Sequence, residues 1–266
     1  MKPVPRWAKI AGGVLLALAL LVALWRWEWL IPLVEARAGA ALGRPVTVES
    51  LDVDLGRVTR VGLGGVTVAN PEGFAADPPF ARAERIEVDV ALGPLLHRRT
   101  VLPRLALTRP EVAVLGTADG ANNYTFPTGE PAAEPGAPPE IGRLEIVEGH
   151  VVARVPRLKA DFAADVATRA ENGVERVVAV AKGTYAGQPI DGRLSGGALL
   201  SLRDGAEPYP IDLALANGPT KVRVEGRLAD PLHLGGATVR LALEGANMAD
   251  LTPLTVKFIN TICHVA

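Results

Sequence analysis

The sequence contains one cysteine, Cys263, and only 5% aromatic residues among its 266. A single cysteine excludes an intramolecular disulfide framework, so the fold must rely on a hydrophobic core. Lysine and arginine total 28 against 29 aspartate and glutamate, which gives a formal net charge of −1. This balance excludes the basic footprint of a nucleic-acid-binding protein. All four tryptophans lie in the first thirty residues, so the rest builds its apolar surface from Val, Leu, Ile and Ala.

Patterns typical of catalysis or of metal binding are scarce. Asp52 and Asp54 could be read as a metal pair, but they fall on the polar side of an expected strand, where solvated carboxylates are the better interpretation. Cys263 and the serines lack the surroundings of a nucleophile. The histidines stand singly, without the spacing of metal ligands: His97, His150, His233 and His264. The sequence therefore predicts that the protein is not an enzyme, and it predicts no catalytic, cofactor-binding or metal-binding residue.

A long apolar run near the N-terminus predicts a membrane anchor. It extends from Ile10 to Leu24 and follows three basic residues. The stretch from Trp7 to Leu30 is long enough to cross a bilayer of ~30 Å. Basic residues favour the cytoplasmic side, so we expect a single-pass helix in the inner membrane, N-in, with the bulk in the periplasm. Tryptophans, which favour the membrane interface, flank the run at both ends: Trp7, Trp25, Trp27 and Trp29.

A cleaved signal peptide is the competing interpretation of the same segment, since it also has a basic region before an apolar one. Small residues at cleavage-site spacing occur at Ala36-Arg37-Ala38 and Ala38-Gly39-Ala40. Both lie well past the apolar run, beyond further charged residues. We therefore favour an uncleaved anchor.

From Arg44 onward, apolar and polar residues alternate with a period of two, which predicts β-strands with one apolar and one wet face. The phase slips across Glu49-Ser50 and again around Gly64-Gly65, which indicates a bulge or a change of face. Such strands are typical of an antiparallel sheet covered on one side. The candidate apolar face comprises Val46, Val48, Val66, Val68, Ile86, Val88, Val90, Leu105 and Leu107.

Composition divides the chain into five expected parts. Residues 1–43 form the anchor and its amphipathic continuation, which should stop at Gly43. Residues 44–127 form a first β segment, 128–140 a Pro- and Ala-rich linker, and 141–255 a second β segment built as a meander of hairpins. Residues 256–266 lose the Ala/Gly/Arg bias of the rest, which suggests a truncated or frameshifted tail.

An ordered set of motifs along nearly the whole chain resembles the AsmA family of bacterial envelope proteins. Where the family often has an Asn-Trp pair, this chain has Asn123-Tyr124. The motifs are Leu42-Gly43-Arg44-Pro45-Val46-Thr47-Val48, Phe80-Ala81-Arg82-Ala83-Glu84-Arg85-Ile86-Glu87-Val88, Gly93-Pro94-Leu95-Leu96, Leu105-Ala106-Leu107-Thr108-Arg109-Pro110-Glu111-Val112, Asp119-Gly120 with Asn122-Asn123-Tyr124, Ile141-Gly142-Arg143-Leu144-Glu145-Ile146-Val147-Glu148-Gly149, Gly226-Arg227-Leu228-Ala229-Asp230-Pro231 and Leu251-Thr252-Pro253-Leu254.

The resemblance implies a mainly β protein whose sheet folds into a groove or open sandwich with an apolar floor. It also implies a role in outer-membrane biogenesis or homeostasis, through phospholipid handling or transport. Periodicity alone favours a closed sandwich core instead. Burial of a lipid chain is worth ~0.8 kcal/mol per CH₂, so a continuous trough could hold one.

The alternative function is a non-transporting envelope scaffold, whose sheet edges or linker bind other envelope proteins. Expected partners are therefore the inner membrane, phospholipid and other envelope proteins, with no nucleic acid.

Overall fold

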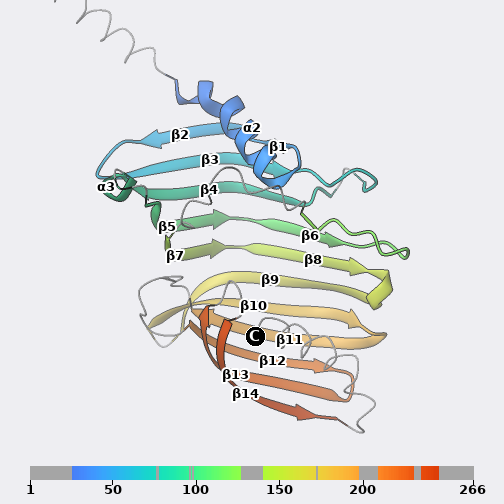
Figure 1. The fold of residues 1–266 in the computed structure, drawn as a ribbon. Coiled ribbons are helices and arrows are strands. Elements are labelled where there is room, and N and C mark those ends of the chain that lie inside the picture. Colours follow the sequence, from blue (N-terminus) through green and yellow to red (C-terminus); the bar gives the residue numbers. More distant parts are fainter. Residues whose placement is uncertain are drawn as a thin grey trace, which may run out of the picture.

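The computed structural model describes residues 26–75, 78–95, 97, 99–126, 140–171, 173–197, 209–230 and 235–245. Over these residues the protein is mainly β, and its strands join in one open sheet (Figure 1). The elements are η1 (Trp27–Leu30), α2 (Ile31–Leu42), β1 (Val46–Thr47), β2 (Ser50–Asp54), β3 (Val58–Val68), β4 (Ala81–Ala91), α3 (Leu92–Leu95), β5 (Val101–Thr108), β6 (Glu111–Leu115), β7 (Glu140–Val147), β8 (Gly149–Val155), η2 (Pro156–Leu158), β9 (Ala160–Glu171), β10 (Val174–Tyr185), β11 (Gln188–Gly197), β12 (Tyr209–Asn217), β13 (Thr220–Asp230) and β14 (Gly235–Glu244).

Most of the expected anchor lies outside the described residues, including Trp7, Ile10, Leu24 and Trp25. Trp27 and Trp29 belong to the short 3-10 helix η1. None of the helices within the described ranges combines the length and the apolarity that crossing a membrane requires. The tail 256–266 and most of the expected linker also lie outside the described residues.

The amphipathic continuation of the anchor is the helix α2. Pro32 lies in its first turn, where a missing N–H costs nothing. The helix ends at Gly43 as predicted, because Gly43 adopts a left-handed φ of 63° and its N–H bonds to the carbonyl of Gly39. From Gly43 the chain continues into β1, and α2 packs beside β1 (Figure 1).

The first half of the sheet is built from long strand lines, three of which are formed by two collinear strands each. β1 and β2 both pair with β3 in one continuous register, and β5 and β6 do the same along β4. β7 pairs with β5 and β8 pairs with β6, with the same register offset in both pairs, but these pairs are parallel. The expectation of an antiparallel sheet is therefore right for most pairs and wrong for these two. The chain must return between Leu115 and Glu140 before β7 begins, and that return makes the pairing parallel.

The second half is the predicted meander. β8 to β14 pair in chain order, and every pair is antiparallel. Two of its turns contain glycines at positive φ, Gly173 and Gly218. Both β segments thus contribute strands to the same sheet.

A line of residues crosses the first half at right angles to the strands, and we call it the seam. Its members are opposite one another on successive strand lines: Glu49, Gly65, Glu84, Arg109 and Glu148. Three of them adopt left-handed backbone angles, with φ of 60° at Gly65, 45° at Arg109 and 53° at Glu148. The pairing register of β3 with β4 is the same on both sides of the seam. No residue is inserted, so the phase slips in the sequence are changes of strand phase rather than bulges.

The seam keeps apolar side chains on one face. Leu63 and Val66 are three residues apart, so strict alternation would point them to opposite faces. Instead Leu63 and its cross-strand partner Ile86 pack against the cluster that contains Val66 and Val48. A left-handed residue between two extended stretches therefore resets the alternation. Ion pairs between Arg109 and both Glu84 and Glu148 connect three members of the seam.

We expect Gly65→Ala to destabilise the fold by about 1–3 kcal/mol, the usual cost of holding a non-glycine residue in a rare backbone region. The added Cβ would also lie 2.3 Å from the Glu49 side chain, which must move. Urea unfolding of both proteins measures the loss. Gly187→Ala is the control, because Gly187 also has positive φ but nothing lies within 4 Å of its Cβ position. An equal loss in both variants would show that the seam imposes no more than ordinary turn strain.

Candidate functional site: the apolar face of the sheet

The apolar face begins under α2. Val46, Val48 and Val66 are buried there, with exposed fractions of 7%, 7% and 8%. The helix contributes side chains that include Val34 and Leu42 to the same cluster. Glu35 of α2 accepts a hydrogen bond from the backbone N–H of Val48 at 2.8 Å, which fixes the helix to the start of the strand line. This part of the face is therefore a packed core.

The remaining predicted residues of the face continue across the next strands. Val68 and Ile86 are half-buried beside the cluster under α2. Ile86 lies opposite Leu107 in the β4–β5 pair. In the same pair Val88 lies opposite Leu105, and in the β3–β4 pair Val90 lies opposite Thr59. The remaining four residues of the candidate set are all half-buried: Val88, Val90, Leu105 and Leu107.

The second half extends the apolar face with residues that the candidate set omitted. Leu213 of β12 is opposite Val224, which is opposite Leu241 of β14. Val224 is 6% exposed, whereas Leu241 at the far edge is 48% exposed. Their alternation was visible in the sequence, but only the register places them in one row. The apolar row thus reaches an exposed end at β14.

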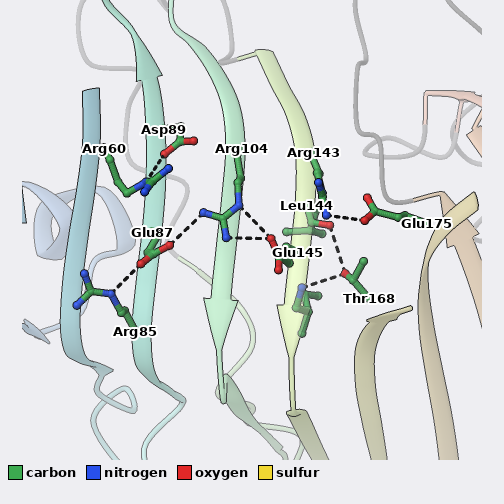
Figure 2. Close-up of polar contacts among 11 residues, drawn as sticks. Arg60, Arg85, Glu87, Asp89, Arg104, Arg143, Leu144, Glu145, Thr168 and Glu175 are labelled. Carbon is green, nitrogen blue, oxygen red and sulfur yellow. Dashed lines mark hydrogen bonds and ion pairs between the residues drawn. The ribbon is translucent and has the colours of Figure 1, made fainter. Parts of the chain in front are cut away.

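The opposite face of the first half carries a ladder of ion pairs, which we call the ionic ladder (Figure 2). It lies opposite because Arg85 and Glu87 alternate with Ile86 and Val88 along β4. The ladder crosses the strands through contacts of 2.9–3.0 Å, in the order Asp52–Arg85, Arg85–Glu87, Glu87–Arg104 and Arg104–Glu145. Asp52, one of the two carboxylates of the metal pair considered from the sequence, is therefore an ion-pair partner.

Electrostatics favour the charged forms within the ladder. Hydrogen bonds from Arg85 and then Arg104 hold the pKa of the Glu87 carboxyl below its usual range, against a smaller opposing effect of burial. Hydrogen bonds to Glu87 and then Asp52 raise the pKa of Arg85. Each such pair near a surface contributes little alone. As a connected series they link β2, β4, β5 and β7, including the parallel β5–β7 pair, in which Pro103 has no N–H to donate.

Arg44 joins the start of the sheet to a later loop. It is only 4% exposed, and its guanidinium lies 4.9 Å from the Phe80 ring centroid and 4.1 Å from that of Phe126. Its Nη2 donates to the Thr125 carbonyl at 2.8 Å. Burial lowers the pKa of Arg44, and the two rings offset part of that cost. The sequence showed Arg44 only as part of a motif.

Asn123 holds the same loop to the sheet and is fully buried. Its Nδ2 donates to the Ala113 carbonyl at 2.7 Å and to Asn70 Oδ1 at 2.8 Å, while its Oδ1 accepts from the Leu115 N–H at 2.7 Å. The Asn-Tyr motif is therefore a structural connection. Among the described residues, no group of three or more His, Cys, Asp or Glu side chains could hold a metal ion.

Comparison with known proteins gives one informative match. The chain is similar to the AsmA family protein YhjG of Escherichia coli (strain K12), with 25% identity over an alignment of 291 positions. The alignment covers 93% of this chain and 42% of that protein, so the chain spans less than half the length of its curated relative. No family model matches. No solved structure matches either.

We expect Glu87→Gln to destabilise the protein by about 0.5–1 kcal/mol at pH 7, as the loss of a partly buried ion pair does. The pKa of Glu87 is lowered by folding, so its contribution is full above the unfolded value of about 4.3 and disappears as pH falls through the folded value. Urea unfolding at pH 7, 5 and 3 should therefore show the difference between variant and wild type shrinking toward pH 3.

Glu72→Gln is the matched control, because Glu72 is exposed and has no ion pair among the described residues. It should change stability little at any of the three pH values. A difference for Glu87→Gln that stays constant from pH 7 to pH 3 would contradict the electrostatic role of the ladder.

Proposed function

We propose, on the premise that this chain belongs to the AsmA family, that it is a protein of the cell envelope that handles phospholipid along the apolar face of its sheet. The relationship to an AsmA family protein supports an envelope-associated role. The proposal that the protein handles lipid depends instead on the apolar face of the sheet.

The observation that carries this proposal is the continuous apolar row on one face of an open sheet. The row passes through Leu213 and Val224 and ends at Leu241, which is 48% exposed, and Leu243 of the adjacent row on the same face is 37% exposed. Acyl chains gain ~0.8 kcal/mol for each CH₂ that such a surface removes from water. The opposite face of the first half carries the ionic ladder, so the two faces differ in what they can bind.

We also propose a cellular location for the protein. Residues 1–43 would anchor it in the inner membrane, N-in, and the sheet would lie in the periplasm. There the row could receive lipid from the nearby leaflet and serve outer-membrane biogenesis or homeostasis. No catalytic step is part of this function.

A non-transporting scaffold is the second candidate. It is favoured by the edge of β14, which pairs only with β13 among the described strands. An open strand edge can accept a strand from another envelope protein. The apolar row would then be an interface for protein rather than for lipid.

We expect a photo-crosslinking amino acid at position 241 of the full chain to capture phospholipid in cells. The matched control is position 242, because Ala242 is the next residue of β14, is also exposed, and points to the opposite face. Cells grown with radioactive phosphate should give a labelled adduct at position 241 and at most a trace at position 242.

Equal labelling at the two positions would contradict a one-faced lipid site. Protein adducts at position 241 without labelled lipid would favour the scaffold instead. A second pair, at Leu213 and Ala214 of β12, separates a site confined to the edge from one that extends along the row.

A further inference from the structure

The charged face of the second half differs from the ionic ladder of the first half in one respect. In the ladder, Arg104 is directly opposite Arg143, but each of these arginines has carboxylate partners: Glu87 and Glu145 for Arg104, and Glu175 for Arg143. In the β9–β10 pair, Arg176 is likewise directly opposite Arg169. Neither arginine has an ion pair or side-chain hydrogen bond with any of the residues that the structure describes. Like charges directly opposite each other destabilise a sheet.

A hollow of about 450 Å³ adjoins this pair. The register places its cationic lining on one face. Arg176 and Val180 are four residues apart in β10 and share a face, Val180 is opposite Arg193, and Arg193 and Arg223 are both opposite Ala214. Three arginines, Arg176, Arg193 and Arg223, line the hollow, and Arg169 stands beside it.

Carboxylates neutralise only part of this charge. Glu171 pairs with Arg193, and Glu225 pairs with Arg223. Asp212 also lines the hollow and, after Glu225, raises the pKa of Arg223 through its charge. These three carboxylates leave the opposed arginines without a counter-charge.

The floor of the hollow supplies a buried hydroxyl. Ser195 is 6% exposed and lies between Val178 and Asp212 in the strand pairings. Its Oγ makes one long contact, at 3.4 Å, with Glu171. Such a hydroxyl can donate to an oxygen held between the arginines.

We propose that this hollow binds a phosphate-type oxyanion, with Arg169 and Arg176 as the main donors and Ser195 at its floor. Guanidinium groups bind phosphate through paired N–H donors, and an anion between the two arginines would turn their repulsion into attraction. The same chemistry is found in a lipid headgroup and in a free phosphate. Arg193 of the hollow adjoins Leu194, which is opposite Leu213 of the apolar row, so the site is on the face opposite that row. It therefore does not depend on acyl-chain binding.

The test uses the full chain purified in dodecyl maltoside, with isothermal titration at low salt against two probes. Inorganic phosphate represents the free anion, and dihexanoyl phosphatidylglycerol represents the headgroup. We expect the wild type to bind at least one of them, and the double variant Arg169→Gln with Arg176→Gln to bind it at least about tenfold more weakly. Phosphate alone would identify a soluble ligand, and phosphatidylglycerol alone a lipid headgroup.

Arg227→Gln is the control, because Arg227 is an exposed arginine of the same face outside the hollow, opposite Pro210. It removes the same type of charge and should leave binding unchanged. An equal loss of binding in this control and in the double variant, or no binding of either probe by the wild type, would overturn the proposal.

Arg176→Glu separates binding from folding. It replaces a repulsive cross-strand pair with an ion pair to Arg169, so the unliganded variant should melt at or above the wild-type temperature while binding is lost. A lower melting temperature would contradict the unfavourable Arg169–Arg176 pairing from which the proposal starts. Lipid crosslinking at position 241 should persist in this variant, so failure of the anion site and failure of lipid handling are distinguishable.

Discussion

The structure depends on one constraint: every strand of the first half must change phase at the same line. A strand alternates its side chains between two faces, so a single change of phase in one strand alone would move its apolar residues into water. The seam places Gly65, Arg109 and Glu148 in left-handed backbone, on three of the five strand lines that it crosses. Because all the lines change together, the pairing register continues across and the apolar face stays whole.

The same constraint explains why the two faces can have separate chemistry. Apolar residues on both sides of the seam pack against the same valine cluster that α2 covers, which leaves the opposite face free for charged side chains. Among the described residues, the ionic ladder links the strands across that face in addition to their backbone pairing. Gly62 matters here, because a Cβ at this position would lie 2.6 Å from Arg85 and 2.9 Å from Asp52, within the ladder itself.

The sequence predicted much of this arrangement, including the mainly β class, the end of α2 at Gly43 and the meander of the second half. The phase slips were also visible, and Gly64-Gly65 marked one of them. Left-handed backbone at Arg109 and Glu148 could not be predicted, because neither is a glycine and only their neighbours across the sheet require that geometry. The parallel strand pairs were missed for a similar reason: alternation specifies faces, whereas the return of the chain specifies direction.

Functional residues were predictable only where local pattern was sufficient. The apolar face follows from alternation, so its nine candidate residues between Val46 and Leu107 could be predicted. The position of Arg169 opposite Arg176 follows instead from the register, which the turn at Gly173 fixes. A turn one residue longer would bring another residue opposite Arg176 and shift the charge pattern of the whole hairpin. A sheet that tolerates an unfavourable pair at the register its turn dictates must be stabilised by the rest of its contacts. Val178 supplies part of that stability, since it is 3% exposed on the same face, two residues from Arg176. Charge on this face is therefore supported by a buried apolar residue, so the two chemistries of the sheet are separated by face only in part.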